Sequence, residues 1–346
     1  MNKNRNLILV ALCSFLVGAS CAVLFLQPAK PTAKVSALRE SNLTTPDSEY
    51  KLIDPLIGVK GINQSTQYNT MQTQVATYIA SQKDNGLLSA SVDFRDIGVP
   101  GGFVLNPSER YTPASLNKVP LMMAYFKIAE TNPNILSQEI TYSGATNSND
   151  IETIKPAVQI SPGTSYTVEQ LIEHMILYSD NNAADLLTHY LNQTNNFSAY
   201  TAVFTDLGVD PNILGTYTDN MTVAEYSIFL RALYNSTYLD WNHSELALQL
   251  LTQTDFSEGL ESGVPNDTQV AEKFGEVKLV SSSGTLVGRE LNNCGMVYYP
   301  NHPYLLCIMT KASGDNIQAL ENEIGAISSI VYKNMETLYP QSSAAH

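Results

Sequence analysis

The chain has 346 residues, 44% of them hydrophobic and 15% charged, so it is long enough for one large core or two domains of ordinary size. Its 16 Pro and 19 Gly exclude a collagen-like or low-complexity architecture, and the apolar fraction excludes a wholly disordered chain. Lys and Arg number 19 against 33 Asp and Glu, and the resulting net charge of −14 argues against a nucleic-acid partner.

An uncharged apolar run occupies residues 7–26, LILVALCSFLVGASCAVLFL, and Lys3 and Arg5 precede it. Twenty helical residues span roughly 30 Å, the thickness of a bilayer's hydrocarbon core. The run predicts an uncleaved transmembrane anchor whose short N-terminus is cytoplasmic and whose remaining chain is outside. A cleaved signal peptide normally has a shorter apolar region, and Gly18 stands where a lipoprotein signal ending at Cys21 usually has a larger aliphatic residue.

The segment that follows, residues 27–65, is rich in Pro, Ser, Thr and Asn and predicts an extracytoplasmic linker. Within it, residues 50–57 are more apolar and are expected to dock on the folded domain. We therefore divide the chain into a cytoplasmic tip and anchor (1–26), a linker (27–65) and a folded domain (66–346).

The folded domain mixes helical and strand patterns. Helices are expected over residues 66–82 and 119–129, after two capping boxes that begin at Thr167 and Thr222, and over a C-terminal apolar stripe from Ile317 to Leu338. Strands are expected over residues 88–97, 270–274, 293–299 and 304–310. Strands at both ends with helices between them predict an α+β fold, an antiparallel sheet flanked by helices with an inserted helical subdomain.

Four cysteines give no disulfide framework. Cys13 and Cys21 lie in the apolar run, while Cys294 and Cys307 lie on two strands expected to be neighbours. A disulfide between the latter two is possible in an oxidising exterior, but two buried thiols are the expected state.

The first motif with chemical meaning is Ser115-Leu116-Asn117-Lys118, at the start of the apolar helix over residues 119–129. Ser115 and Lys118 are one turn apart and share a face. A serine hydroxyl is inert until a base takes its proton, and a neutral, desolvated lysine can do that. Pro120, about one turn into the helix, predicts a local kink.

Two further motifs follow in order: Ser179-Asp180-Asn181 at a helix-to-helix corner, and Lys273-Phe274-Gly275 on a strand. With the S-x-x-K motif they resemble the class A β-lactamase-like serine hydrolases of the penicillin-recognising group, whose signature is S-x-x-K, S-D-N and K-T-G. The resemblance covers roughly residues 66–340 and includes the final strand pair and the long C-terminal helix.

The resemblance implies a role for each matching residue. Ser115 is the nucleophile and Lys118 its base, while Ser179 passes the proton to the leaving nitrogen. Asn181 binds the substrate's side-chain amide and Lys273 its carboxylate. The oxyanion hole takes the backbone N–H groups of Ser115 and of Glu276, the residue after Gly275.

The third motif departs from the family. Phe274 replaces a hydroxyl residue and Glu276 adds a negative charge, which together predict a modified substrate preference. A rival alignment places the motif at Ser282-Ser283-Gly284, which leaves no lysine and a protein that only binds. We prefer Lys273 and interpret the serine run as an inserted loop.

The family's deacylating Glu is also missing. Residues 207–222 resemble the end of the loop that carries it, but most of the loop is deleted and no Glu remains. Asp206 and Asp210 are the only acids at its start and are expected to be turn or cap residues.

The sequence thus predicts a membrane-anchored, extracytoplasmic serine hydrolase that β-lactams or peptidoglycan-type peptide amides acylate at Ser115, with slow deacylation. The alternative is a weakly active or inactive binding protein at the cell surface. No cofactor is expected, and the sequence contains no metal-ligand spacing such as His-x-x-x-His or Cys-x-x-Cys.

Overall fold

The computed structural model describes residues 50–54, 66–97, 99, 101–214 and 221–341, all within a unit that runs from Ser48 onward. The predicted anchor at residues 7–26 and most of the predicted linker lie outside these residues. Among the residues that are described, no helix is both long and apolar enough to span a bilayer.

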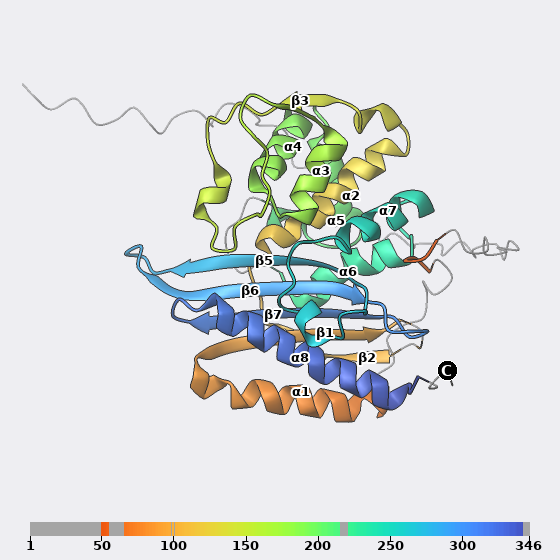
Figure 1. Ribbon diagram of the computed structural model, residues 1–346, viewed down its shortest axis with the longest axis vertical. Coiled ribbons are helices and arrows are strands. Elements are labelled where there is room, and N and C mark those ends of the chain that lie inside the picture. Colours follow the sequence, from red (N-terminus) through yellow and green to blue (C-terminus); the bar gives the residue numbers. More distant parts are fainter. Residues whose placement is uncertain (1–49, 55–65, 98, 100, 215–220, 342–346) are drawn as a thin grey trace, which may run out of the picture. The chain divides into compact units, whose positions relative to one another are not determined.

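A five-stranded antiparallel sheet forms the centre of the unit, in the order β2-β1-β7-β6-β5 (Figure 1). The strands are β1 (Leu87–Asp96), β2 (Gly101–Leu105), β5 (Val270–Val280), β6 (Leu286–Val297) and β7 (Tyr304–Ser313). The three predicted C-terminal strands are confirmed, but β5 and β6 are longer than predicted. Their extra length forms a hairpin around the Ser281–Thr285 turn, which the hydrophobic pattern does not reveal because Val280 and Val287 are exposed.

Helices α1 (Asn69–Ser81) and α8 (Ile317–Leu338) cover one face of the sheet (Figure 1). A helical lobe covers the other face. It comprises α2 (Lys118–Ala129), α3 (Val168–Leu177), α4 (Asn181–Gln193), α5 (Phe197–Asp206), α6 (Val223–Tyr234) and α7 (Trp241–Leu251), with a small hairpin of β3 (Glu139–Thr141) and β4 (Ser165–Thr167). This arrangement confirms the predicted α+β fold with an inserted helical subdomain.

Strand alternation divides the core into two clusters. On β7, Leu305 and Met309 pack against the helical lobe, whereas Leu306 and Ile308 pack against α1 and α8. Because side chains alternate across a strand, a sheet buried on both faces shows near-continuous apolar runs rather than alternation. The two predicted capping boxes are formed at Thr167–Gln170 and Thr222–Glu225, each with both reciprocal hydrogen bonds.

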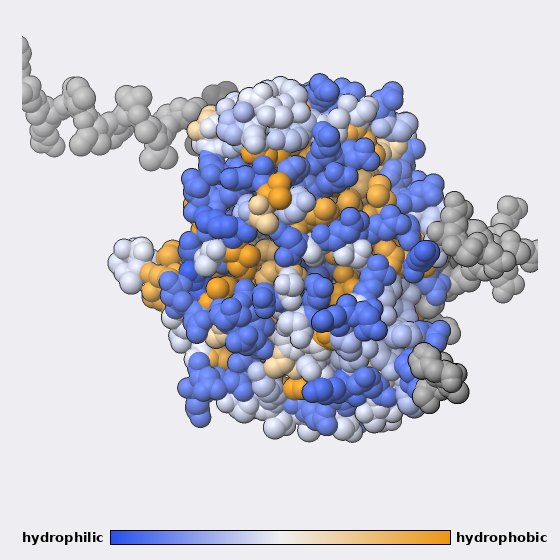
Figure 2. Space-filling model, viewed as in Figure 1, coloured by the Kyte–Doolittle hydropathy of each residue, from blue (hydrophilic) through white to orange (hydrophobic). Residues whose placement is uncertain are grey.

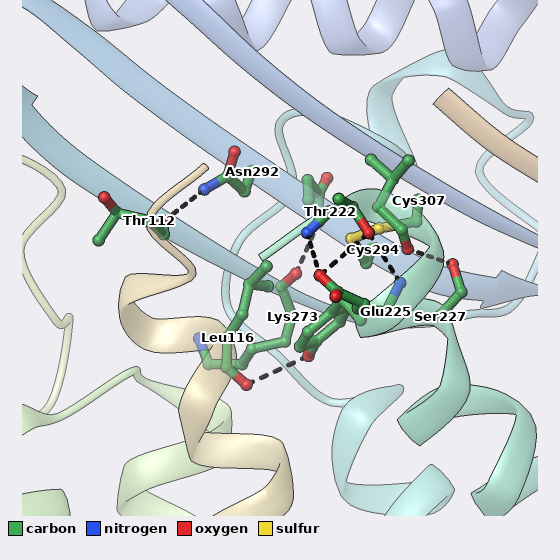
Figure 3. Close-up of a disulfide and its surroundings, with 12 residues drawn as sticks. Thr112, Leu116, Thr222, Glu225, Ser227, Lys273, Asn292, Cys294 and Cys307 are labelled. Carbon is green, nitrogen blue, oxygen red and sulfur yellow. Dashed lines mark hydrogen bonds between the residues drawn. A yellow bond between two sulfur atoms is a disulfide. The ribbon is translucent and has the colours of Figure 1, made fainter. Parts of the chain in front are cut away.

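The sheet contains one cross-strand disulfide, between Cys294 of β6 and Cys307 of β7 (Figure 3). The expectation of two free buried thiols is therefore wrong. The two residues are register partners on adjacent strands and both point into the helical-lobe side of the core, where their side chains meet. Lys273 of β5 is the other register partner of Cys294, so the disulfide lies directly beside it.

The segment at residues 50–54 docks on α7, as predicted for the start of the 50–57 stretch; residues 55–57 lie outside the described part. The backbone N–H groups of Lys51, Leu52 and Ile53 donate to the Glu245 carboxylate. Leu52 is buried, and Tyr50 Oη donates to Asn242 Oδ1. The folded unit thus includes residues of the predicted linker.

Candidate active site

Ser115 lies in a single 3-10 turn, Ala114–Asn117, that runs directly into α2. In a 3-10 turn, residues three apart eclipse each other, which places Lys118 directly over Ser115. Pro120 is the third residue of α2 and so lies in its first turn, where proline is tolerated. Ala114 has a φ of 49°, a left-handed conformation that is costly for a residue with a Cβ.

The structure brings Lys118 together with the second motif. Lys118 Nζ lies 2.9 Å from Ser115 Oγ, 3.0 Å from Ser179 Oγ, 2.6 Å from the Ser179 carbonyl oxygen and 2.6 Å from Asn181 Oδ1. Burial lowers the pKa of Lys118 to about 8, although Glu152, Asp180 and Asp185 act in the opposite direction. A lysine with such a pKa can take a proton from a hydroxyl near neutral pH.

The corner between α3 and α4 is built to present Ser179 and Asn181. Ser179 has a φ of 56°, and Asp180 is the N-cap of α4, accepting from the backbone N–H groups of Asn182 and Ala183. Asp180 is fully buried and also accepts from Asn149 Nδ2 and from the backbone N–H of Ile160. These bonds fix the corner and hold Ser179 and Asn181 towards Lys118.

The third motif reaches the same place from the sheet. A Cβ on Gly275 would lie 2.5 Å from the Pro113 carbonyl oxygen and 3.0 Å from the Ser115 backbone nitrogen, so only glycine allows β5 to approach the nucleophile this closely. Lys273 lies on the same face of β5 and is fully buried. Within the described part of the chain its Nζ has no hydrogen-bond partner, and burial followed by the charge of Lys118 lowers its pKa well below the usual range.

Phe274 packs in the core cluster beneath α1 and α8 and stacks on Phe256, with ring centroids 4.2 Å apart, while Lys273 Nζ lies 4.3 Å from the centroid of the Phe274 ring. The rival Ser282-Ser283-Gly284 lies in the exposed turn of the β5–β6 hairpin, which projects from the molecule in Figure 2. Lys273-Phe274-Gly275, not the serine run, thus lies beside Ser115.

Sequence reasoning missed one ionisable group of the site, Glu152. Its Oε1 accepts a 2.5 Å hydrogen bond from Asn181 Nδ2, and burial raises its pKa. Glu152 belongs to the irregular segment between β3 and β4, which has no periodicity and no motif, so no sequence signal indicated its position. Glu276 was expected as an oxyanion-hole backbone donor; its side chain accepts from the backbone N–H groups of Thr153 and Ile154.

Arg289 of β6 is engaged by acids. It lies 3.6 Å from Glu276 and forms a tight ion pair with Asp315. Asp210 caps the short turn Pro211–Ile213, and Asp206 is exposed at the end of α5, as predicted for both.

Among the described residues, one group has the donor set for a metal ion: Glu130, Asp240 and His243, at the end of α2 and the start of α7. Asp240 caps α7 through the His243 backbone N–H, and Glu130 accepts from Lys127 and from the Asp240 backbone N–H. These acids have structural partners, and the group provides nothing for the chemistry at Ser115.

The site combines a serine with a desolvated lysine one turn away. A second serine and an asparagine contact that lysine, and a strand with a glycine lies beside the nucleophile. This arrangement defines an active-site-serine hydrolase. The chain belongs to the β-lactamase enzyme family, whose model matches residues 71–335. No curated protein sequence is similar enough to count as a relative.

Solved structures share the fold at low sequence identity. PBP-A is 18% identical, with a TM-score of 0.64 over 81% of this chain and 99% of that chain. A variant of the class A β-lactamase of the last common ancestor of Gram-negative bacteria is 23% identical, with a TM-score of 0.60 over 78% and 100%. A β-lactamase from Xanthomonas campestris pv. campestris is 18% identical, with a TM-score of 0.62 over 77% and 98%.

Proposed function

We propose that this chain is a membrane-anchored, extracytoplasmic serine hydrolase that β-lactams or related cell-wall peptide amides acylate at Ser115. The observation that carries the proposal is the position of Lys118, fully desolvated and within hydrogen-bond distance of Ser115, Ser179 and Asn181. A variant of PBP-A, a protein with the same fold, has been solved as an acyl-enzyme complex with penicillin G.

In the proposed reaction, neutral Lys118 takes the proton of Ser115 as Oγ forms a bond to the amide carbonyl carbon. Ser179 relays a proton from Lys118 to the leaving nitrogen as the C–N bond breaks. The developing oxyanion lies between the backbone N–H groups of Ser115 and Glu276, an arrangement worth about two to three orders of magnitude in rate per donor. Lys273 binds the substrate carboxylate, because an anion there favours the protonated form of an amine that burial otherwise disfavours.

Slow deacylation is the second part of the proposal. Residues 207–222 contain no Glu, and the two acids at their start serve as a cap and an exposed helix end. Without a glutamate on that loop to activate water, the acyl-enzyme persists. Phe274 also stands in place of the hydroxyl residue of the family's third motif, which removes one hydrogen bond to a substrate carboxylate and fits the expected change in substrate preference.

Localisation outside the cytoplasm is supported by two independent features. The apolar run at residues 7–26 has the length and the flanking charges of an anchor. The buried disulfide between Cys294 and Cys307 is typical of a protein that folds in an oxidising compartment.

A surface binding protein without catalysis is the alternative function. It has no use for a serine and a desolvated lysine in hydrogen-bond contact, and keeping a lysine buried costs stability. The hydrolase therefore accounts for more of the site.

The test is intact-protein mass spectrometry of residues 50–346, which include the docked segment, after incubation with a fluorescent penicillin, beside Ser115→Ala. We expect an adduct of one penicillin per chain that decays over minutes to hours and is absent from Ser115→Ala. Rapid release of hydrolysed drug would show that another group activates water. An unmodified wild-type chain with every lactam tested would favour the binding protein.

A further inference from the structure

Glu152 is hydrogen-bonded to the side-chain amide of Asn181, the group that is expected to bind the substrate. Asn181 uses its Oδ1 for Lys118 and its Nδ2 for Glu152 Oε1, at 2.6 and 2.5 Å respectively. The Asn181 amide thus connects Glu152 to Lys118. Attraction to the negative charge of Glu152 is the strongest of the effects that favour the protonated form of Lys118.

Residues 151–155, here called the strap, hold Glu152 in this position. The strap descends from the β3–β4 hairpin to β5 (Figure 1). Glu276 accepts from two of its backbone N–H groups, Lys278 Nζ donates to the Ile151 carbonyl oxygen at 2.6 Å, and Arg289 donates to Thr153 Oγ1 at 2.5 Å. All three anchor residues lie on β5 or β6, so the strap bridges the helical lobe and the sheet beside the nucleophile.

Glu152 of the strap and Glu276 of β5 differ in which positive charges lie near them. Glu276 has Arg289 beside it, at 3.6 Å. Among the residues that the structure describes, no arginine pairs with Glu152; its carboxyl group adjoins that of Glu276, and the cation that stabilises its charge is Lys118, on the far side of Asn181. Burial and the neighbouring Glu276 raise the pKa of Glu152, so a cation placed beside this carboxylate would stabilise its charged form.

We propose that Glu152 is a specificity-determining residue that selects substrates carrying an ammonium group on the acyl side of the scissile amide. The inference rests on the proposed acylation at Ser115. Asn181 Nδ2 donates one hydrogen to Glu152 Oε1 and the other, at 3.3 Å, to the Ser148 carbonyl oxygen. A substrate amide oxygen that takes over the longer of these bonds brings the carbon next to that amide to the side of Asn181 where Glu152 lies. An ammonium on that carbon supplies a cation beside Glu152.

The same contact promotes catalysis. An ammonium that pairs with Glu152 cancels the charge that most favours protonated Lys118, so Lys118 releases its proton more readily when such a substrate is bound. A charge-assisted hydrogen bond in a part-buried site, together with this effect, corresponds to about a 10- to 100-fold preference in acylation rate.

A purely structural role is the competing explanation, in which Glu152 only ties the strap to Asn181. Glu152→Gln separates the two roles. Its amide oxygen still accepts from Asn181 Nδ2 and its shape is unchanged, but its negative charge is gone. If the role is structural, the substitution leaves substrate preference as it was.

The experiment compares ampicillin with benzylpenicillin, which differ only by an ammonium group on the carbon next to the side-chain amide. Second-order acylation rate constants are measured at pH 6.5 for wild type, Glu152→Gln and the control Glu173→Gln, which removes an exposed acid from α3. We expect ampicillin to react about 10- to 100-fold faster with wild type and with the control, and at nearly the same rate as benzylpenicillin with Glu152→Gln.

Equal rates for the two penicillins in wild type, or a preference that survives in Glu152→Gln, would overturn the inference while leaving acylation at Ser115 in place. The wild-type ratio alone is decisive if the variant proves unstable. Absence of any Ser115 adduct with either drug is a different result, because it removes the proposed function and the inference together.

Discussion

Two buried lysines face each other across this site and have opposite surroundings. Lys118, on the helical lobe, has four oxygens within hydrogen-bond distance, whereas Lys273, on the sheet, has no hydrogen-bond partner for its Nζ among the described residues. Burial lowers the pKa of both. Lys118 has its hydrogen-bond acceptors in place before substrate binds and is therefore preorganised. Lys273 has none, so its amine is expected to gain a partner when an anionic group of the substrate binds.

The walls that carry the two lysines differ in the same sense. The lobe side retains every residue of the family motifs, and its corner is fixed by the buried carboxylate of Asp180. The sheet side has lost the hydroxyl of the third motif and carries Glu276 and the strap instead. This contrast fits the proposed function, in which Ser115 is acylated and the substrate preference differs from that of the family.

The largest expected effect comes from Lys118→Met, which keeps the side-chain volume and removes the base. Acylation by a fluorescent penicillin should fall by about 10³-fold, within the usual range for a general base. Because the Ser179 carbonyl and Asn181 Oδ1 lose a buried partner, the variant should also unfold more easily, by about 1–3 kcal/mol. Rate constants from gel fluorescence and a thermal melt measure the two effects; acylation at the wild-type rate would show that another group is the base.

Lys273→Met is the matched substitution on the other wall, and a smaller loss is expected. Acylation by a carboxylate-bearing penicillin should fall about 10- to 100-fold through loss of a charged hydrogen bond to substrate. The melting temperature should be unchanged or higher, since no hydrogen bond is lost, the buried amine is removed, and methionine can still pack on the Phe274 ring that Lys273 Nζ contacts. A drop in melting temperature as large as that of Lys118→Met would contradict the proposed difference between the two lysines.

The parts of this site that the sequence predicted are those where chemistry requires a fixed spacing. Ser115 and Lys118 are one turn apart, and Gly275 follows Lys273 on a strand, so residue order alone indicates their faces. The capping boxes at Thr167 and Thr222 were predictable for the same local reason. Glu152 and the strap were not, because an irregular segment has no period that relates sequence position to direction, and its contacts with β5 are to residues more than a hundred positions away.

The disulfide shows a second limit. Sequence placed Cys294 and Cys307 on neighbouring strands, but whether they form register partners depends on the length of the turn between β6 and β7 and on a pairing that one residue of slip would abolish. The same dependence on register applies to Lys273 and Cys294, whose adjacency is a property of the sheet rather than of either motif.

The smallest expected effect concerns the pH dependence of acylation. With the pKa of Lys118 lowered to about 8, the base is protonated and inactive at low pH, so the acylation rate should rise about tenfold per pH unit below 8 and level off above it. Glu152 favours the protonated form of Lys118. Glu152→Gln should therefore move the rising limb of the pH–rate profile to lower pH and raise the rate with benzylpenicillin at pH 7 by roughly two- to five-fold.

Asp185→Asn provides the graded control for this shift. Asp185 also favours protonated Lys118, but less strongly than Glu152, and asparagine can still accept the hydrogen bond from Ser148 Oγ. The limb should therefore move in the same direction by a smaller amount. Equal displacement in both variants would mean that overall charge sets the pKa of Lys118, whereas a limb near pH 10 in all three proteins would mean that Lys118 is solvated and not the base. A larger displacement in Glu152→Gln than in Asp185→Asn is the result expected if Glu152, next to Lys118 across the Asn181 amide, has the strongest effect on the pKa of Lys118.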